Sequence, residues 1–321
     1  MEHTIIIGGG PCGLACALEL QKQGIQPLVI EQGNIVDTIY HYPTHQTFFS
    51  TSNKLEIGGI PFIDEKPKPV RMDALVYYRE VVKRNEIRVH AYEAMTDVQK
   101  TAEGQLKVFT KKNKQQQIYY TENVIIATGY YNQPQLLHIP GEQLLKVSHY
   151  FKEAHPYYNK DIVVIGGKNS AVDTALELQR AGANVTVLYR GAEYSSSIKP
   201  WILPGFDSLV QKQAIHLEFH ASVTEITEKT VYYQVNGQKK QITNDFVFAM
   251  TGYMPNIPLL EKIGIEVDHQ TGRPTFDPHT FETNVKNVYV AGVVISGYNG
   301  NETFIENGRF HGKQISTAIN T

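Results

Sequence analysis

The first residues whose spacing could do chemistry form a glycine-rich turn near the N-terminus. Gly8, Gly10 and Gly13 have the G-x-G-x-x-G spacing, between an isoleucine run, residues 5–7, and a helical pattern. In a dinucleotide fold these glycines permit the turn, let the backbone approach the pyrophosphate, and let the helix pack closely on the strand. The N–H groups that begin the helix then face the phosphates. This turn, with Pro11, is therefore expected to bind a dinucleotide.

An acidic residue follows at the place where a ribose-hydroxyl acceptor belongs. The next expected strand, residues 27–30, ends on Glu31. An acid about 20 residues after the glycine turn is the second part of the dinucleotide signature. We expect further contacts from Gln32, and from Thr128 and Gly129 at the end of a later strand.

The same pattern returns in the second half of the chain. A β-branched run, residues 162–165, leads into a second glycine-containing turn, and the strand at 185–189 ends on Arg190. A guanidinium there fits a ribose 2′-phosphate through two hydrogen bonds, which favours NADPH over NADH. Lys168 takes the middle-glycine place, where it either crowds the pyrophosphate or supplies charge to it. The residues of this turn expected to contact the nucleotide are Gly166, Gly167, Lys168, Asn169 and Ser170.

The repeat extends to two strand ends. Thr128-Gly129 has a counterpart in Thr251-Gly252, which we also expect near a nucleotide. Two such units indicate two dinucleotides. Because the first ribose position has an acid and the second a base, we assign FAD to the first and NADPH to the second. Lys199 could face the same phosphate as Arg190, or be an ordinary surface lysine.

Cys12 is the one thiol that a motif places in the expected site. It lies at the N-terminus of the first expected helix, where the helix dipole lowers a thiol pKa. Two interpretations stay open: Cys12 forms a mixed disulfide with a substrate thiol, or it is a small residue tolerated beside the pyrophosphate. Cys16, the only other cysteine, lies one helical turn further on. A disulfide between the two would be strained.

Composition limits the class of protein. The 321 residues, of which 41% are hydrophobic and 19% charged, suit about two globular domains. The net charge of −2 favours neither nucleic acid nor an anionic membrane as partner. No apolar run is long enough to span a bilayer, and the first strand leaves no room for a signal peptide. We therefore expect a cytoplasmic protein, and no metal site, because the histidine pairs lack a third ligand.

Periodicity and turn residues predict the remaining elements. Residues 37–62 form a long aromatic-rich loop, residues 71–84 a helix, and residues 87–127 a meander of short strands. Asn236-Gly237 predicts a hairpin turn. Near the C-terminus a strand leads to Gly292, and we expect a terminal helix from about residue 301. Its first residues, Glu302 and Thr303, would direct N–H groups at the flavin pyrimidine ring.

With these motifs in place, the chain resembles the flavoprotein reductases of the low-molecular-weight thioredoxin reductase type. That resemblance implies an α/β fold of two Rossmann-like, three-layer ββα domains. The NADPH domain, residues 134–244, would be inserted into an FAD domain, residues 1–133 and 245–321. Finer motifs, at 8–13, 166–171, 197–204 and 305–312, resemble the bacilliredoxin reductase family, also called bacillithiol-disulfide reductases. The resemblance implies an NADPH- and FAD-dependent enzyme that reduces bacillithiol disulfide or a bacilliredoxin mixed disulfide. We also expect a homo-oligomer.

Two departures distinguish this chain from thioredoxin reductase. The stretch at 147–152 lacks the Cys-x-x-Cys pair, and Val293 stands where most relatives have an aspartate for the flavin ribityl chain. Bacilliredoxin reductases resemble this chain in lacking that aspartate. The alternative functions are a ferredoxin/flavodoxin–NADP reductase or a flavin monooxygenase, although the F-x-G-x-x-x-H signature of the latter is missing. A non-catalytic flavoprotein that binds a partner is a further alternative.

Overall fold

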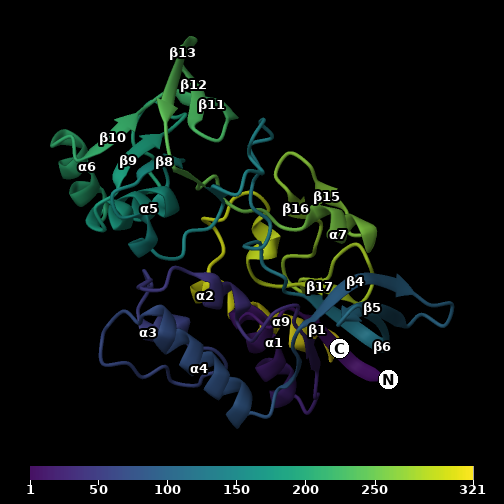
Figure 1. The fold of residues 1–321 in the computed structure, drawn as a ribbon. Helices are drawn as coiled ribbons and strands as arrows, with labels where there is room; N and C mark the ends of the chain where they lie inside the picture. Colours follow the sequence, from purple (N-terminus) through teal and green to yellow (C-terminus); the bar gives the residue numbers. More distant parts are fainter. Residues whose placement is uncertain (321) are drawn as a thin grey trace. The chain divides into compact units, whose positions relative to one another are not determined.

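The computed structural model describes residues 1–320, which form two compact units (Figure 1). Unit 1 contains residues 1–133 and those from 253 onward, and unit 2 is the inserted segment Pro134–Gly252. The sequence predicted that the insert ends at residue 244. The observed unit continues to Gly252 because strand β14 (Phe246–Ala249) pairs in parallel with β8 (Asp161–Ile165) of the insert.

The sheet of unit 1 joins a parallel half to an antiparallel meander. Its order is β3-β2-β1-β6-β5-β4, and β17 also pairs with β6. The long strand β6 belongs to both halves: its first part pairs with β5 antiparallel, and its second part with β1 and β17 in parallel. The strands are β1 (Glu2–Ile7), β2 (Leu28–Ile30), β3 (Arg88–His90), β4 (Glu93–Lys100), β5 (Leu106–Lys112), β6 (Gln115–Ile126) and β17 (Val288–Val290).

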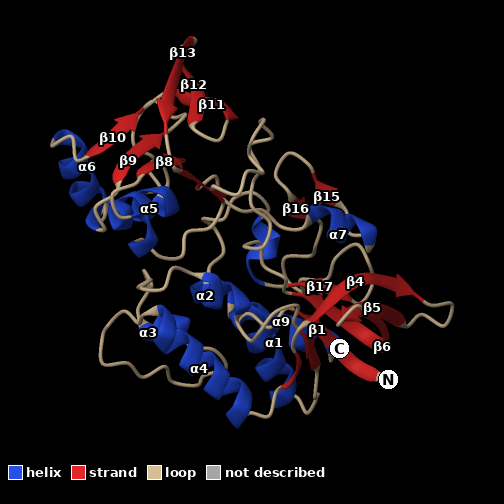
Figure 2. Ribbon diagram, in the orientation of Figure 1, coloured by secondary structure: helices blue, strands red, loops and turns tan. Residues whose placement is uncertain are grey.

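Alternation along β1 divides unit 1 into three layers (Figure 2). Ile6 packs on one face with the buried residues of helices α1 (Pro11–Lys22), α4 (Arg71–Arg84) and α9 (His311–Ile319). Ile5 and Ile7 pack on the other face with the meander and with α7 (Ile257–Lys262). Successive side chains of a strand point to opposite faces, so a buried run such as this one serves two cores. The expected ββα layering is confirmed.

Unit 2 repeats the plan on a smaller scale. Its parallel sheet has the order β10-β9-β8-β14-β7, with α5 and α6 in one core and a three-stranded sheet in the other. Asn236 and Gly237 both have positive φ, 50° and 81°, so the predicted hairpin turn is confirmed. The further elements are β7 (Val147–Ser148), η1 (His155–Tyr157), α5 (Asn169–Arg180), β9 (Asn184–Leu188), α6 (Leu203–Gln211), β10 (Ile215–Glu218), β11 (Ala221–Ile226), β12 (Thr230–Val235) and β13 (Gln238–Thr243).

Most expected elements of unit 1 are observed, but the C-terminal helix begins later than predicted. The predicted helix at 71–84 matches α4. Instead of one helix from residue 301, the chain forms η2 (Gly292–Ser296), α8 (Ile305–Gly308) and then α9. The Asn307 side chain accepts from the Phe304 N–H, which fixes the start of α8 at Ile305. The other elements of unit 1 are α2 (Asp37–His41), α3 (Ser52–Leu55), β15 (Val267–Asp268) and β16 (Arg273–Pro274).

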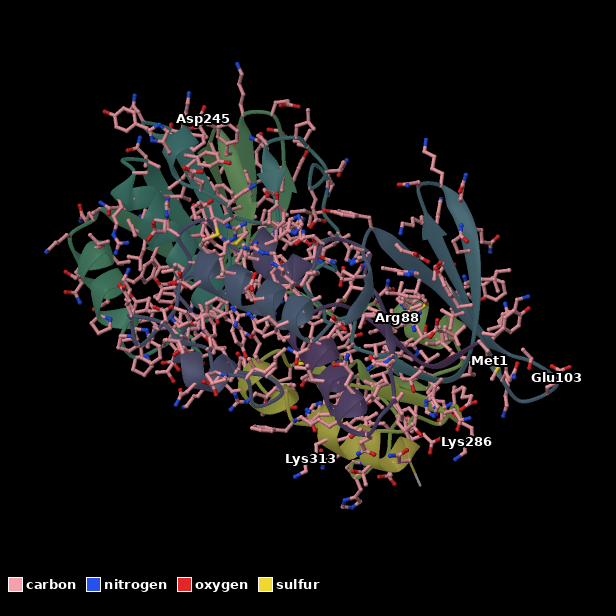
Figure 3. The ribbon with its side chains drawn as sticks, turned by 90° about the horizontal axis from the view of Figure 1, so that it is seen from below. Met1, Arg88, Glu103, Asp245, Lys286 and Lys313 are labelled. Carbon is pink, nitrogen blue, oxygen red and sulfur yellow. The ribbon has the colours of Figure 1, made fainter. Side chains whose placement is uncertain are left out.

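Several charged side chains of unit 1 are exposed, whereas Glu31, Arg71 and Glu93 are buried. Glu103, Lys286 and Lys313 lie near the outline of the molecule in Figure 3, and the exposed Arg88 pairs with Glu2. No helix within residues 1–320 has the length and apolar character needed to cross a membrane.

Candidate active site

In the first glycine turn, Gly8 and Gly13 pack against other backbone atoms and have no room for a side chain. Gly10 has free space on the side where a ligand would approach. A Cβ on Gly8, whose φ is +113°, would lie 2.3 Å from the Ala127 carbonyl oxygen. One on Gly13 would lie 2.0 Å from the Gly8 carbonyl oxygen. By contrast, a Cβ on Gly10 would meet no heavy atom within 4 Å. Packing therefore requires glycine at positions 8 and 13, and the open side at Gly10 fits a pyrophosphate.

Glu31 is held in one orientation by backbone N–H groups. Its Oε2 accepts from Gly9 N–H and its Oε1 from Gly33 N–H, each at 2.7 Å. Burial raises the pKa of Glu31, and the hydrogen bonds from Gly33 and Gly9 oppose that shift. The carboxylate is thus a fixed acceptor at the carboxyl end of β2, where a ribose hydroxyl would donate to it.

A cavity of about 80 Å³ adjoins this turn, and its lining includes five of the expected contact residues: Gly8, Glu31, Gln32, Thr128 and Gly129. They come from the ends of three neighbouring parallel strands, the edge at which such sheets bind ligands. A larger hollow, of about 570 Å³, runs along α4 and contains none of the expected residues. The smaller cavity therefore lies at the sheet edge where a dinucleotide fold binds its ligand.

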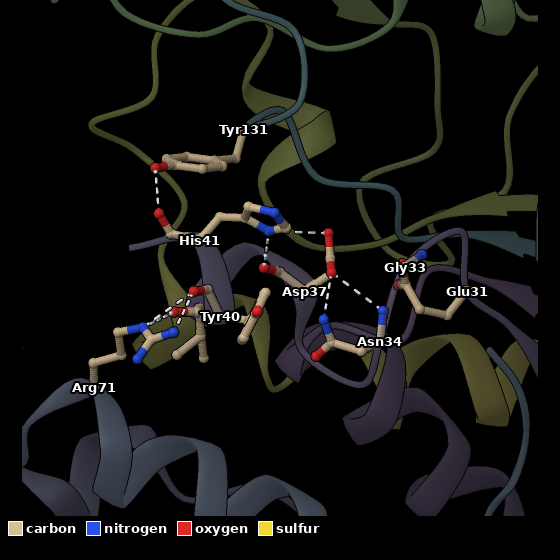
Figure 4. Close-up of polar contacts among 9 residues, drawn as sticks. Glu31, Gly33, Asn34, Asp37, Tyr40, His41, Arg71 and Tyr131 are labelled. Atoms are coloured by element: carbon tan, nitrogen blue, oxygen red, sulfur yellow. Dashed lines mark hydrogen bonds and ion pairs between the residues drawn. The ribbon is translucent and has the colours of Figure 1, made fainter. Parts of the chain in front are cut away.

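The segment that follows Glu31 is held by several side-chain hydrogen bonds (Figure 4). Asp37 accepts from the backbone and side-chain nitrogens of Asn34 at 3.2 and 2.6 Å. Arg71, from α4, donates to the Tyr40 carbonyl at 2.5 Å, and Tyr131 donates to the His41 carbonyl at 3.2 Å. The predicted long loop thus contains α2, and side chains from distant segments fix it in place.

The turn of unit 2 differs from the first in its side chains. A Cβ on Gly166 would lie 2.4 Å from the Met250 carbonyl oxygen, so glycine is required there. A Cβ on Gly167 would lie 2.3 Å from the Tyr189 ring, which covers this glycine. Lys168 precedes α5 and is exposed, so its side chain does not fill the turn. Asn169 donates to the Ser197 carbonyl at 2.8 Å and accepts from Lys199 N–H at 2.9 Å.

The basic residues predicted for the 2′-phosphate lie near the same turn. Arg190 follows β9 and is exposed, while Lys199 is half-buried and tied through its backbone to the start of α5. Ser170 is exposed in the first turn of α5. These positions leave a cationic rim at the carboxyl ends of β8 and β9.

Thr251 and Gly252 lie at the C-terminal end of unit 2 and hydrogen-bond to Gln135, at its N-terminal end. The Thr251 hydroxyl donates to the Gln135 carbonyl at 2.5 Å, and Gln135 N–H donates to the Gly252 carbonyl at 2.9 Å. The two connecting segments therefore bind each other at this point. The sequence placed a nucleotide contact here, and the observed bonds give these residues a role in the connection.

Cys12 lies in the first turn of α1, partly exposed and in contact with two glycines from the C-terminal region. A Cβ on Gly308 would lie 2.8 Å from the Cys12 Sγ, and one on Gly292 would lie 3.0 Å from it. Burial, and then the charge of Glu306, raise the pKa of Cys12 to about 12. The expectation of a lowered pKa was therefore wrong, because desolvation of the thiolate outweighs the helix dipole.

Glu302 and Thr303 do not begin a helix, contrary to the prediction. Glu302 is exposed and forms an ion pair with Arg273. Thr303 is buried and accepts a hydrogen bond from Ser296 at 2.6 Å. The N–H groups at a helix start in this region belong to α8, which begins at Ile305. A flavin contact at these two residues would therefore not use a helix dipole.

Comparison with known proteins identifies the family of this chain. The model of the pyridine nucleotide-disulphide oxidoreductase family matches residues 5–292. A bacilliredoxin reductase, Bdr, of Bacillus subtilis is 59% identical over 99% of this chain and 97% of its own. The solved bacillithiol disulfide reductase Bdr (YpdA) of Bacillus cereus is 58% identical, covers 99% of this chain and 98% of its own, and has a TM-score of 0.97. Thioredoxin reductase of Lactococcus lactis, at 22% identity and a TM-score of 0.76 over 100% of this chain and 98% of its own, shares the fold.

The fold and the paired glycine turns thus define an oxidoreductase of the two-dinucleotide class. The chain belongs to the pyridine nucleotide-disulphide oxidoreductases and, within them, to the bacilliredoxin reductase family, which confirms the resemblance drawn from its motifs.

Sequence reasoning missed the residues that surround Cys12 from afar. Gly308 and His311 were noted only as parts of a family motif, and no local pattern connects them to residue 12. The one available signal was a glycine-rich segment followed by a helix with several small residues. Small residues let two helices approach closely, so this pattern could have indicated the contact.

Proposed function

We propose that this protein is an NADPH-dependent FAD flavoprotein that reduces bacillithiol disulfide or a bacilliredoxin mixed disulfide. The observation that carries the proposal is 59% identity over nearly the whole chain to a bacilliredoxin reductase. The retained glycine turns and the acid and base at the two ribose positions support it. Both cysteines are free thiols, which suits a reducing compartment such as the cytoplasm.

The first turn would hold FAD. Gly8 and Gly13 shape the turn, the open side of Gly10 would admit the pyrophosphate, and Glu31 would accept from the ribose. The second turn would hold NADPH, with Arg190 on the 2′-phosphate and Lys168 near the pyrophosphate. When bound, the two cofactors supply the hydride and electron transfer chemistry, and the protein orients them.

Cys12 is the residue that we propose exchanges with the substrate disulfide. Its thiol would lose a proton, attack one sulfur of the substrate S–S bond, and release the other sulfur as a thiolate that takes up a proton. Burial raises the pKa of Cys12, so removal of the thiol proton is part of the proposed exchange step.

Steady-state NADPH oxidation by the flavin-loaded protein tests the proposed function. Bacillithiol disulfide, a bacilliredoxin mixed disulfide, ferredoxin and oxygen are compared as acceptors at equal concentration. We expect one of the two disulfides to be reduced fastest. Faster reduction of ferredoxin, or consumption by oxygen alone, would contradict the proposal and favour the alternative flavoprotein activities.

The Cys12→Ala variant tests the thiol separately. Loss of disulfide turnover by about 10³-fold or more, with FAD retained and NADPH still reducing the flavin, is expected for a lost nucleophile. Cys16→Ala is the matched control, because Cys16 is fully buried one helical turn further along α1. Unchanged turnover in Cys12→Ala would remove Cys12 from the reaction.

A further inference from the structure

His311 is a buried residue at the start of α9 that neither the glycine turns nor the proposed reaction uses. Its ring stacks on Phe281, with centroids 4.4 Å apart, and its Nδ1 lies 3.1 Å from the Gly292 backbone nitrogen. A backbone N–H can only donate, so Nδ1 is the acceptor and the neutral ring carries its proton on Nε2. Burial lowers the pKa of His311 to about 4, which keeps this form at neutral pH.

Gly292, the donor in this bond, forms one wall of the space around the Cys12 thiol. Its φ is +75°, and a Cβ there would lie 2.9 Å from the Cys12 Cβ and 3.0 Å from the Sγ. The backbone of Gly292 is therefore in close contact with Cys12. Because Cys12 is partly exposed, this turn limits the directions from which a reagent can reach the thiol.

His311 is itself fixed relative to the helix that carries Cys12. The next residue, Gly312, packs so closely on α1 that a Cβ there would lie 2.8 Å from the Cys16 Cα. The Phe281 ring covers the imidazole from one side. The position of Nδ1 of His311 is thus fixed relative to α1. Through the hydrogen bond, the position of Gly292 is fixed relative to α1 as well.

We propose that His311 is a positioning residue: its Nδ1 holds the Gly292 turn against Cys12 and so restricts access to that thiol and slows its reaction. The inference rests on the proposed function only where disulfide turnover is concerned. The contact between Gly292 and Cys12 itself depends on residues of unit 1 alone.

Three variants separate the hydrogen bond from the packing of the ring. His311→Phe keeps a ring for Phe281 and removes the acceptor. His311→Asn removes the ring but places an amide oxygen close to the position of Nδ1. His279→Phe, at an exposed histidine of the same unit, is the matched control. The rate constant for alkylation of Cys12 by iodoacetamide is measured at pH 8 on flavin-loaded protein, by mass spectrometry of its peptide.

We expect His311→Phe to raise the alkylation rate about tenfold, because a buried N–H without an acceptor moves toward water. His311→Asn should return the rate to near that of the wild type, and His279→Phe should leave it unchanged. An unchanged rate in His311→Phe would overturn the proposal. So would a rate in His311→Asn as high as in His311→Phe, because packing would then hold the turn.

Amide exchange of Gly292 in the wild type decides the question if His311→Phe does not fold. Slow exchange supports the bond, and exchange at the rate of an unprotected amide overturns it. Turnover separates this inference from the proposed function. Faster alkylation in His311→Phe, with disulfide turnover unchanged in both that variant and Cys12→Ala, leaves the positioning role intact and removes Cys12 from the reaction.

Discussion

The two glycine turns of this chain share a backbone plan but differ in how much protein surrounds them. In unit 1 the acid, Glu31, is buried and fixed by two backbone N–H groups, and the turn adjoins a cavity. In unit 2 the basic residues Lys168 and Arg190 are exposed at the rim. A buried, preorganised site favours a nucleotide that stays bound, and an open cationic rim favours one that arrives by electrostatic attraction and leaves again. The pair thus suits a resident flavin and an exchanging NADPH.

The largest expected effect comes from breaking the first turn. Gly8→Ala forces a Cβ to within 2.3 Å of the Ala127 oxygen at a φ of +113°. We expect a loss of about 3 kcal/mol or more in the free energy of unfolding, from strain and overlap together. Thermal unfolding and the ratio of flavin to protein after purification measure it.

Gly10→Ala is the control for that prediction, because its φ is −77° and its surroundings are open. Flavin-free Gly10→Ala should unfold at the same temperature as flavin-free wild type, while its flavin content falls. Equal losses of stability in the two variants would mean that position 10 serves packing and not a ligand.

Reversing the charge in the second turn is expected to change nucleotide preference. Arg190→Glu removes a bidentate partner of the 2′-phosphate and adds a repelling charge, so the KM for NADPH should rise about tenfold or more. The KM for NADH should change little. Arg180→Glu, an equal charge change on the exposed face of α5, should leave both values alone. The assignment fails if Arg190→Glu uses NADPH as well as wild type does.

The pH dependence of Cys12 alkylation tests how far burial controls the first site. Only the thiolate reacts, and the pKa of Cys12 is raised to about 12. The rate should therefore climb about tenfold for each pH unit from 7 to 10 without levelling, whereas an ordinary thiol levels above about pH 9. A plateau near pH 8 would show that the helix dipole, and not desolvation, sets the pKa.

The smallest effect is expected at Asn169, which ties the start of α5 to the segment at 197–199. Asn169→Ala removes the bonds to Ser197 and Lys199, at a cost of about 1–2 kcal/mol in the stability of unit 2. Ser170→Ala, at an exposed position, should leave the unfolding temperature unchanged. If Asn169→Ala unfolds at the wild-type temperature, the second turn does not depend on this tie.

The sequence predicted those parts of the site whose residues lie close together along the chain. The turn at residues 8–13 and Glu31 lie within one strand–helix–strand unit, so their spacing predicts their meeting. The environment of Cys12 could not be predicted, because Gly292 and Gly308 reach it only through the tertiary fold. The predicted lowering of the Cys12 pKa was wrong for the same reason. The sequence shows that Cys12 lies at a helix N-terminus, but it does not show the burial by distant segments. The start of α8 at Ile305 involves a side-chain bond, in which Asn307 accepts from the Phe304 N–H.

The most direct test of the account is the anaerobic reduction of the bound flavin by the two nicotinamide nucleotides. We expect the purified protein to be yellow with one FAD per chain, and NADPH to bleach that absorbance much faster than equal NADH. A protein that stays colourless after reconstitution with FAD, or a flavin that NADH reduces as fast as NADPH, would contradict the assignment of the two turns.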